Sequence, residues 1–206
     1  MNNNDDDNQN VFMEAFHDTV RQNKWTRDDL QDSLLILDHT TSNTALDMPI
    51  RTLSKYAKEE LGMIVVVDGA HGILGHDLHL GNGEDGIMDF VDIYVGNCHK
   101  WLCTPRGVGF IYCPNPTLRE KILRYPAVMS HGIDQGYHNR FLWDGCRDYA
   151  AALSLPAVLD FWEQQQQQKE GIPRRLTVLR NRAVQILGEA WHGTSNDVTL
   201  APLDIH

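Results

Sequence analysis

The sequence predicts an α/β protein with a mostly parallel sheet. Short apolar runs that suit buried strands, at 33–38 and 63–68, enclose a segment with helical periodicity at 49–61. Three strand-like runs also end in polar residues. In parallel sheets the carboxyl ends of the strands line the ligand site. These observations predict both the layered fold and the place of a site within it.

The first third of the chain contains two predicted helices and one strand. Residues 1–10 are almost all Asn and Asp, and we expect a disordered tail because they bury little. Apolar spacing over 11–23 predicts a helix, and Thr26 is a candidate N-cap for a short turn. The run SLLILD at 33–38 predicts a strand buried on both faces. Residues 49–61 predict a helix that ends at Gly62.

The middle of the chain repeats the strand pattern. Residues 63–68, MIVVVD, again end an apolar run in a carboxylate. Residues 69–86 are rich in Gly and His and predict a loop. The runs 90–95 and 108–113 predict two more strands, and their short connection favours antiparallel pairing. Helices are expected over 115–124, 149–168 and 173–191.

Composition excludes several classes of function. The formal net charge is −10, with 28 acidic and 18 basic residues and no basic stripe, which argues against nucleic-acid binding. The apolar runs are too short to cross a membrane, and the first residues resemble neither a signal nor a transit peptide. We therefore expect a cytoplasmic protein. Its cysteines form no CxxC pair and are expected to be reduced and partly buried: Cys98, Cys103, Cys113 and Cys146.

The polar strand ends predict one site with an amine and a carboxylate. Pyridoxal phosphate (PLP) chemistry needs a lysine that forms a Schiff base with the cofactor aldehyde. It also needs a carboxylate that keeps the pyridine nitrogen protonated. Lys100 and Asp68 follow two strand candidates and fit these two roles.

The segments VDGAH at 67–71 and GNCHKW at 96–101 resemble the class V aminotransferase family of fold-type I PLP enzymes. The match is closest to its isopenicillin-N-epimerase-like and cysteine-desulfurase-like branches. DHTTSNTA at 38–45 and WDGCRD at 143–148 resemble two further family motifs. The resemblance implies a three-layer α/β/α partial large domain over 11–190, followed by the start of a truncated small domain over 191–206.

The resemblance also implies roles for individual residues. Lys100 matches the Schiff-base lysine, and once freed by the substrate amine it would be the catalytic base. The other implied cofactor contacts are Asp68 at the pyridine nitrogen, His71 and Ser42 near the ring hydroxyl, and Asn97 and His99 near the phosphate. Cys146 replaces a Thr that reaches a partner subunit's phosphate, and a thiol is a weaker donor than a hydroxyl.

Two features of the family have no counterpart here: a phosphate loop at a helix N-terminus upstream of Asp38, and an arginine that binds the substrate carboxylate. We therefore expect an interior fragment or truncated gene model with reduced affinity for PLP. The predicted function is PLP-dependent epimerisation, C–S cleavage or transamination of an amino acid, in a homodimer. The sequence does not choose among these reactions.

Alternative functions remain open. One is an inactive fragment that serves as a binding or dimerisation module. Another is a metal-dependent hydrolase that uses His71, His76 and His79, although their spacing matches no common zinc frame and we expect no metal. Arg106 suits either the substrate or the surface. Arg147 is expected to pair with a neighbouring aspartate.

Overall fold

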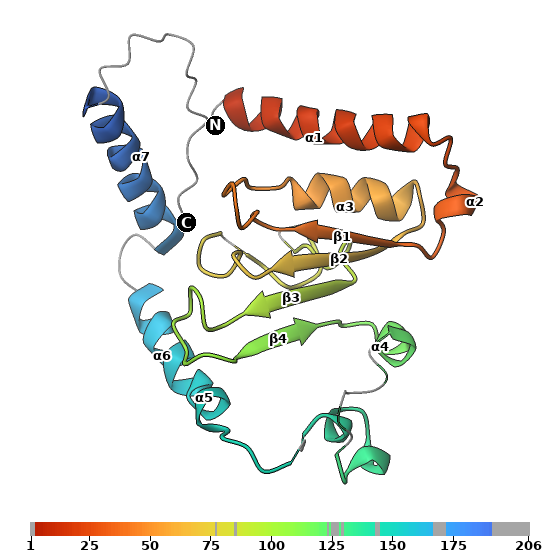
Figure 1. Cartoon of the computed structure of the whole chain (residues 1–206), viewed down its shortest axis with the longest axis vertical. Coiled ribbons are helices and arrows are strands. Elements are labelled where there is room, and N and C mark those ends of the chain that lie inside the picture. The colour runs from red at the N-terminus through yellow and green to blue at the C-terminus, as the bar shows by residue number, and fades with distance from the viewer. Residues whose placement is uncertain are drawn as a thin grey trace.

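Four strands form one sheet in the order β1-β2-β3-β4 (Figure 1). The computed structural model describes residues 3–190, apart from 77, 85, 123, 125–127, 129, 143–144 and 167–171. The strands are β1 (Leu34–Asp38), β2 (Ile64–Gly69), β3 (Ile93–Asn97) and β4 (Gly109–Tyr112). β1, β2 and β3 are parallel, and β4 is antiparallel to β3. The predicted mostly parallel sheet is confirmed.

Helices precede, connect and follow these strands. They are α1 (Asn3–Gln22), α2 (Arg27–Leu30), α3 (Ile50–Glu59), α4 (Pro116–Ile122), α5 (Ala150–Leu153), α6 (Leu155–Gln166) and α7 (Ile172–Ala190), with 3₁₀ turns η1 (Ile133–Gln135) and η2 (His138–Arg140). Thr26 caps α2 as predicted. Its hydroxyl accepts from the backbone N–H of Asp29, whose carboxylate accepts from the Thr26 N–H in return.

The main core lies between the sheet and α3. α3 packs on β1 and β2, and α1 packs on α3, so both helices cover one side of the sheet (Figure 1). Ala57 of α3, Val65 and Val67 of β2, and Tyr94 of β3 are completely buried there. Each valine side chain removed from water contributes about 1.5–3 kcal/mol to stability. This packing fixes β2 relative to β3, the two strands that carry the predicted lysine and carboxylate at their ends.

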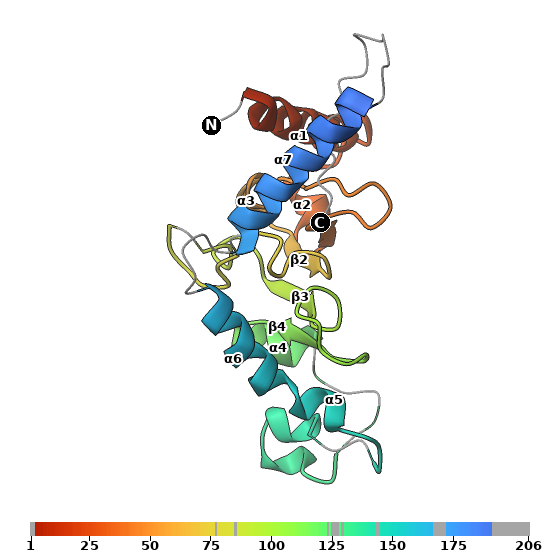
Figure 2. The same ribbon diagram turned by 90° about the vertical axis from the view of Figure 1, so that its left-hand side faces the viewer.

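A smaller apolar group lies beside the end of β3. Cys98, Leu102 and Val108 are buried against the apolar side chains of α5 and α6. The indole Nε1 of Trp162, in α6, donates a hydrogen bond of 2.9 Å to the Leu102 carbonyl. Figures 1 and 2 both place α6 beside the carboxyl end of β3. α6 is thereby fixed to the segment that follows β3.

Three predictions about elements were wrong. α1 begins at Asn3, so most of the predicted disordered tail is helical. β1 is not buried on both faces: it is the edge strand of the described sheet, and Leu34 and Ile36 are 49% and 66% exposed. β3 begins at Ile93 rather than residue 90, because Phe90 lies in a turn and Val91 is buried in the connection. In the sequence, an apolar residue of a buried loop cannot be distinguished from an apolar residue of a strand.

The last helical region divides in two. The predicted helix over 149–168 is interrupted at Ser154, and α6 starts again with Pro156 in its first turn, where a missing N–H costs nothing. Residues 191–206, predicted to begin a second domain, lie outside the described part of the chain. Among the described residues, no helix combines the length and apolarity that a membrane span requires.

Candidate functional site

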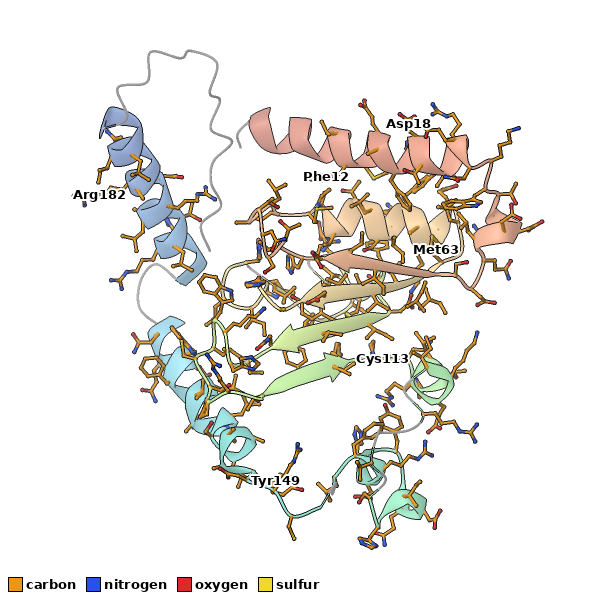
Figure 3. The ribbon with its side chains drawn as sticks, in the orientation of Figure 1. Phe12, Asp18, Met63, Cys113, Tyr149 and Arg182 are labelled. Carbon is orange, nitrogen blue, oxygen red and sulfur yellow. The ribbon has the colours of Figure 1, made fainter. Side chains whose placement is uncertain are left out.

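The polar strand ends meet at one edge of the sheet. Parallel strands end on the same side, so the segments that follow β1, β2 and β3 are neighbours. Figure 3 shows Met63 and Cys113 at the opposite edge, where β2 begins and β4 ends. Two segments carry most of the predicted site. We call residues 68–72 the aspartate turn and residues 97–104 the lysine turn.

In the aspartate turn, Asp68 is exposed, one residue before the end of β2. Its Oδ1 accepts a 2.9 Å hydrogen bond from the Ala70 N–H, which orients the carboxylate and leaves Oδ2 available to a ligand. The strand register places Asp38 of β1 directly opposite Asp68. Two adjacent carboxylates produce a negative potential at this edge, and a cationic group binds favourably there.

In the lysine turn, Asn97 and His99 are held by local hydrogen bonds. Asn97 Oδ1 accepts from the His99 N–H at 3.2 Å, which leaves the two amide N–H groups for a ligand. The Val108 carbonyl lies 3.1 Å from His99 Nδ1, so Nδ1 carries the donated proton. This hydrogen bond fixes the ring orientation through Nδ1, and Nε2 is the nitrogen that can face a ligand. Both side chains can therefore present polar atoms beyond the end of β3.

The two turns meet through His71 and Lys100. The Lys100 amine is exposed, and its Nζ lies 3.0 Å from Nε2 of His71. Lysine has no acceptor when charged, so Nζ donates and the imidazole accepts. The structure thus places the predicted amine in contact with the segment that carries the predicted carboxylate.

A partly buried polar cluster lies behind the aspartate turn. The Tyr94 hydroxyl is 3.0 Å from His39 Nδ1, and the His39 ring stacks on His76 with 4.3 Å between centroids. His76 Nε2 lies 3.0 Å from the Thr40 hydroxyl and 3.1 Å from an Asp47 carboxylate oxygen. The sequence indicated His39 as a strand-end residue, but Tyr94 was missed because it reads as an ordinary apolar position within a strand.

The remaining candidate residues lie apart from this contact. Ser42 is exposed in the turn after β1, and no described hydrogen bond joins it to another predicted site residue. Arg106 is also exposed. The Arg147 guanidinium lies 4.9 Å from the Tyr149 ring centroid, a stacking that the sequence did not predict. Trp143 and Asp144 of the WDGCRD motif lie outside the described residues.

The histidines predicted as alternative metal ligands have separate surroundings. His71 contacts Lys100, His76 belongs to the cluster with Asp47, and His79 is exposed. Within the described ranges, no three His, Cys, Asp or Glu side chains form a group that could hold a metal ion.

The two cysteines that flank Lys100 differ in exposure. Cys98 is buried as expected, and burial raises its pKa. Cys103 is exposed, although it was expected to be partly buried.

The fold and these strand-end side chains define an α/β protein whose candidate ligand site lies at the carboxyl edge of its sheet. Residues 18–192 match the family model for aminotransferase class V, so the chain belongs to that family. This confirms the predicted family and implies PLP as the cofactor.

An isopenicillin N epimerase, of one predicted branch, and L-cysteine desulfhydrases are similar to this chain. An L-cysteine desulfhydrase of Arabidopsis thaliana is 33% identical over 159 residues, which cover 77% of this chain and 33% of that protein. An isopenicillin N epimerase of Streptomyces clavuligerus is 37% identical over 141 residues, which cover 62% of this chain and 34% of that protein. The chain therefore spans about a third of the length of these relatives.

A solved structure supports the fold. The crystal structure of the cysteine desulfurase CsdA of Escherichia coli matches with a TM-score of 0.58 and 19% identity, over 83% of this chain and 41% of that one. At this identity the similarity concerns the fold alone. The fold-type I prediction is confirmed.

Proposed function

We propose that the chain binds PLP through Lys100 and belongs to an enzyme that acts on an amino acid. The observation that carries the proposal is the 3.0 Å contact between Lys100 Nζ and His71 Nε2, with Asp68 three residues before His71. It brings an exposed amine to the turn that carries an exposed carboxylate.

The residues present fit this cofactor. Asp68 Oδ2 and the opposed Asp38 provide the negative potential that a protonated pyridine nitrogen requires. The Asn97 amide offers donors for an anionic group, and His99 offers a further one at Nε2 when its ring is protonated. When bound, PLP supplies an aldehyde that attaches to an amine and a ring that accepts electrons from the α carbon.

In this proposal His71 assists Lys100. Its Nε2 is within hydrogen-bond distance of Nζ and can accept a proton from the amine. The amine is then able to take the α proton of a bound amino acid. Since epimerisation, elimination and transamination share this proton transfer, the proposal covers the amino-acid class without selecting one reaction.

L-cysteine is the first substrate to test. The support for it comes from the relatives, since the chain is 33% identical to an L-cysteine desulfhydrase and 32% identical to a probable chloroplastic one, both of Arabidopsis thaliana. Sulfide release, pyruvate formation and loss of optical activity, measured side by side, distinguish elimination from epimerisation.

The test of cofactor attachment is reduction with borohydride in the presence of PLP, followed by peptide mass spectrometry. We expect the adduct at Lys100 and its loss in Lys100→Ala. Lys121→Ala is the matched control, because Lys121 is an exposed lysine that pairs with Asp32, two residues before β1 begins and so away from the strand ends that carry the turns. A wild-type chain without the Lys100 adduct contradicts the proposal and favours the binding-module alternative.

Homodimer formation stays a prediction that sedimentation equilibrium would test.

A further inference from the structure

Tyr94 and His39 form a buried pair behind the aspartate turn. Tyr94 is completely buried and His39 is 7% exposed, and the Tyr94 hydroxyl lies 3.0 Å from His39 Nδ1. Burial, with a smaller effect from the Asp68 charge, raises the pKa of Tyr94 above its ordinary value. The hydroxyl therefore stays neutral at physiological pH and is a stable hydrogen-bonding group.

The aspartate turn rests directly on this pair. A Cβ atom at Gly69 would overlap the Tyr94 ring, and a Cβ at Gly72 would overlap both His39 Nδ1 and the Tyr94 hydroxyl. Neither glycine has a left-handed φ. They are thus required for space, and the space they leave is filled by Tyr94 and His39.

The pair is itself held from the β1 side. His39 stacks on His76, whose Nε2 contacts the Thr40 hydroxyl and the Asp47 carboxylate. Thr40 Oγ1 also donates to Asp47 Oδ1 at 2.8 Å. Titratable groups near the pair thus include His76 and Asp47 from the loops and Asp68 from β2.

Tyr94 joins the two halves of the site. It belongs to β3, six residues before Lys100, and its side chain lies against the turn that contains Asp68 and His71. We propose that Tyr94 and His39 are positioning residues, which hold the aspartate turn where His71 meets Lys100. They act through the backbone of Gly69 and Gly72. Their effect on the cofactor rests on the proposed function, whereas their effect on His71 does not.

The first experiment uses the full chain without cofactor. Long-range ¹H–¹⁵N spectra of the histidine rings report the hydrogen bonding of each ring nitrogen, with assignment by His39→Gln and His71→Gln. We expect Gly72→Ala and Tyr94→Phe to shift the nitrogens of both His39 and His71. Gly81→Ala is the matched control, because a Cβ there meets nothing within 4 Å. Tyr94→Phe retains the ring, so it keeps the test valid if Gly72→Ala does not fold.

The outcome for His71 decides the proposal. A change at His39 with unchanged His71 nitrogens in both variants overturns it, since the pair would then not position the turn. The second experiment measures PLP attachment. The loss of one hydrogen bond in Tyr94→Phe predicts about two- to tenfold weaker attachment. If the wild-type chain attaches no PLP, the proposed function fails, while the ring-nitrogen result still decides the role of Tyr94 and His39.

Discussion

The aspartate turn and the lysine turn are fixed in different ways. The aspartate turn contains two glycines and rests on two side chains from other segments, those of Tyr94 in β3 and of His39 just after β1. The lysine turn is held mainly by hydrogen bonds to its backbone. Thr104 N–H donates to the Cys98 carbonyl at 3.2 Å, Cys98 N–H donates to the Val108 carbonyl beyond the turn at 3.0 Å, and Trp162 of α6 donates to the Leu102 carbonyl at 2.9 Å. The aspartate turn depends on side-chain packing, whereas the lysine turn depends mainly on hydrogen bonds to its backbone.

This difference predicts where substitutions have long-range effects. A turn that rests on buried side chains moves when those side chains change, even though they never touch the ligand. A turn held by hydrogen bonds to its backbone responds to the loss of a hydrogen-bond partner and to changes in its own backbone conformation. The proposed Schiff-base amine is thus on the segment held mainly by hydrogen bonds, and its proposed carboxylate and imidazole partners are on the segment held by packing.

Removing the support of the aspartate turn should have the largest effect. Tyr94→Ala replaces a completely buried aromatic side chain, and we expect a loss of about 3–5 kcal/mol in the free energy of unfolding. Urea denaturation followed by circular dichroism measures it. Tyr112→Ala, at a site 38% exposed on β4, is the control and should cost much less. Equal losses in the two variants would show that the support is not concentrated at Tyr94.

Removing the charge of the aspartate turn comes next. Asp68→Asn keeps the shape of the side chain but loses the charge that, in the proposed function, faces the cofactor nitrogen. A charged hydrogen bond contributes about 1.5–3 kcal/mol, so we expect about 10- to 100-fold slower turnover with the best substrate. Asp38→Asn, across the register, should have a smaller effect because it contributes only through the field. A larger effect at Asp38 would reverse the two roles.

High pH should gradually lower the free energy of unfolding through Tyr94. The folded-state pKa of Tyr94 is raised, so above its ordinary value of 10.0 the unfolded chain loses this proton while the folded chain keeps it. Stability is therefore complete below pH 10 and falls above it, by up to about 1.4 kcal/mol per pH unit. Urea midpoints between pH 9 and 11 measure the slope. In Tyr94→Phe this component should vanish, and an unchanged slope would assign it to other groups.

The smallest effect is expected within the lysine turn. Cys103 has a left-handed backbone, with φ of 60°, although it is not glycine. Cys103→Gly removes that strain, which costs about 1–2 kcal/mol for a residue with Cβ, but adds freedom to the unfolded chain. We expect a net gain of a few tenths of a kcal/mol, measured as a rise in melting temperature. Cys146→Gly is the comparison, since Cys146 is exposed and lacks a positive φ. A loss of stability at Cys103 would show that its side chain packs in the turn.

The sequence predicted the strands and the polar residues at their ends better than the buried side chains that pack behind them. The alternation of apolar runs with helical patterns identified all four strands, and the polar ends of those strands identified Asp68 and Lys100. It did not predict the role of Tyr94, because a side chain that fills space left by distant glycines has no local pattern. It also placed β1 in the interior, since an apolar run does not reveal which neighbours cover it. Local chemistry can be read from the chain, whereas contacts between separate elements cannot.

The indole of Trp162 has a consequence for how much of the chain the site needs. It caps the Leu102 carbonyl, two residues after Lys100, from a position 60 residues further along the chain. A product of alternative splicing or proteolysis that ends after α4 would retain the whole sheet and both turns, yet lack this contact. The shortest segment of the chain that keeps this contact to the lysine turn therefore extends past the last strand to α6.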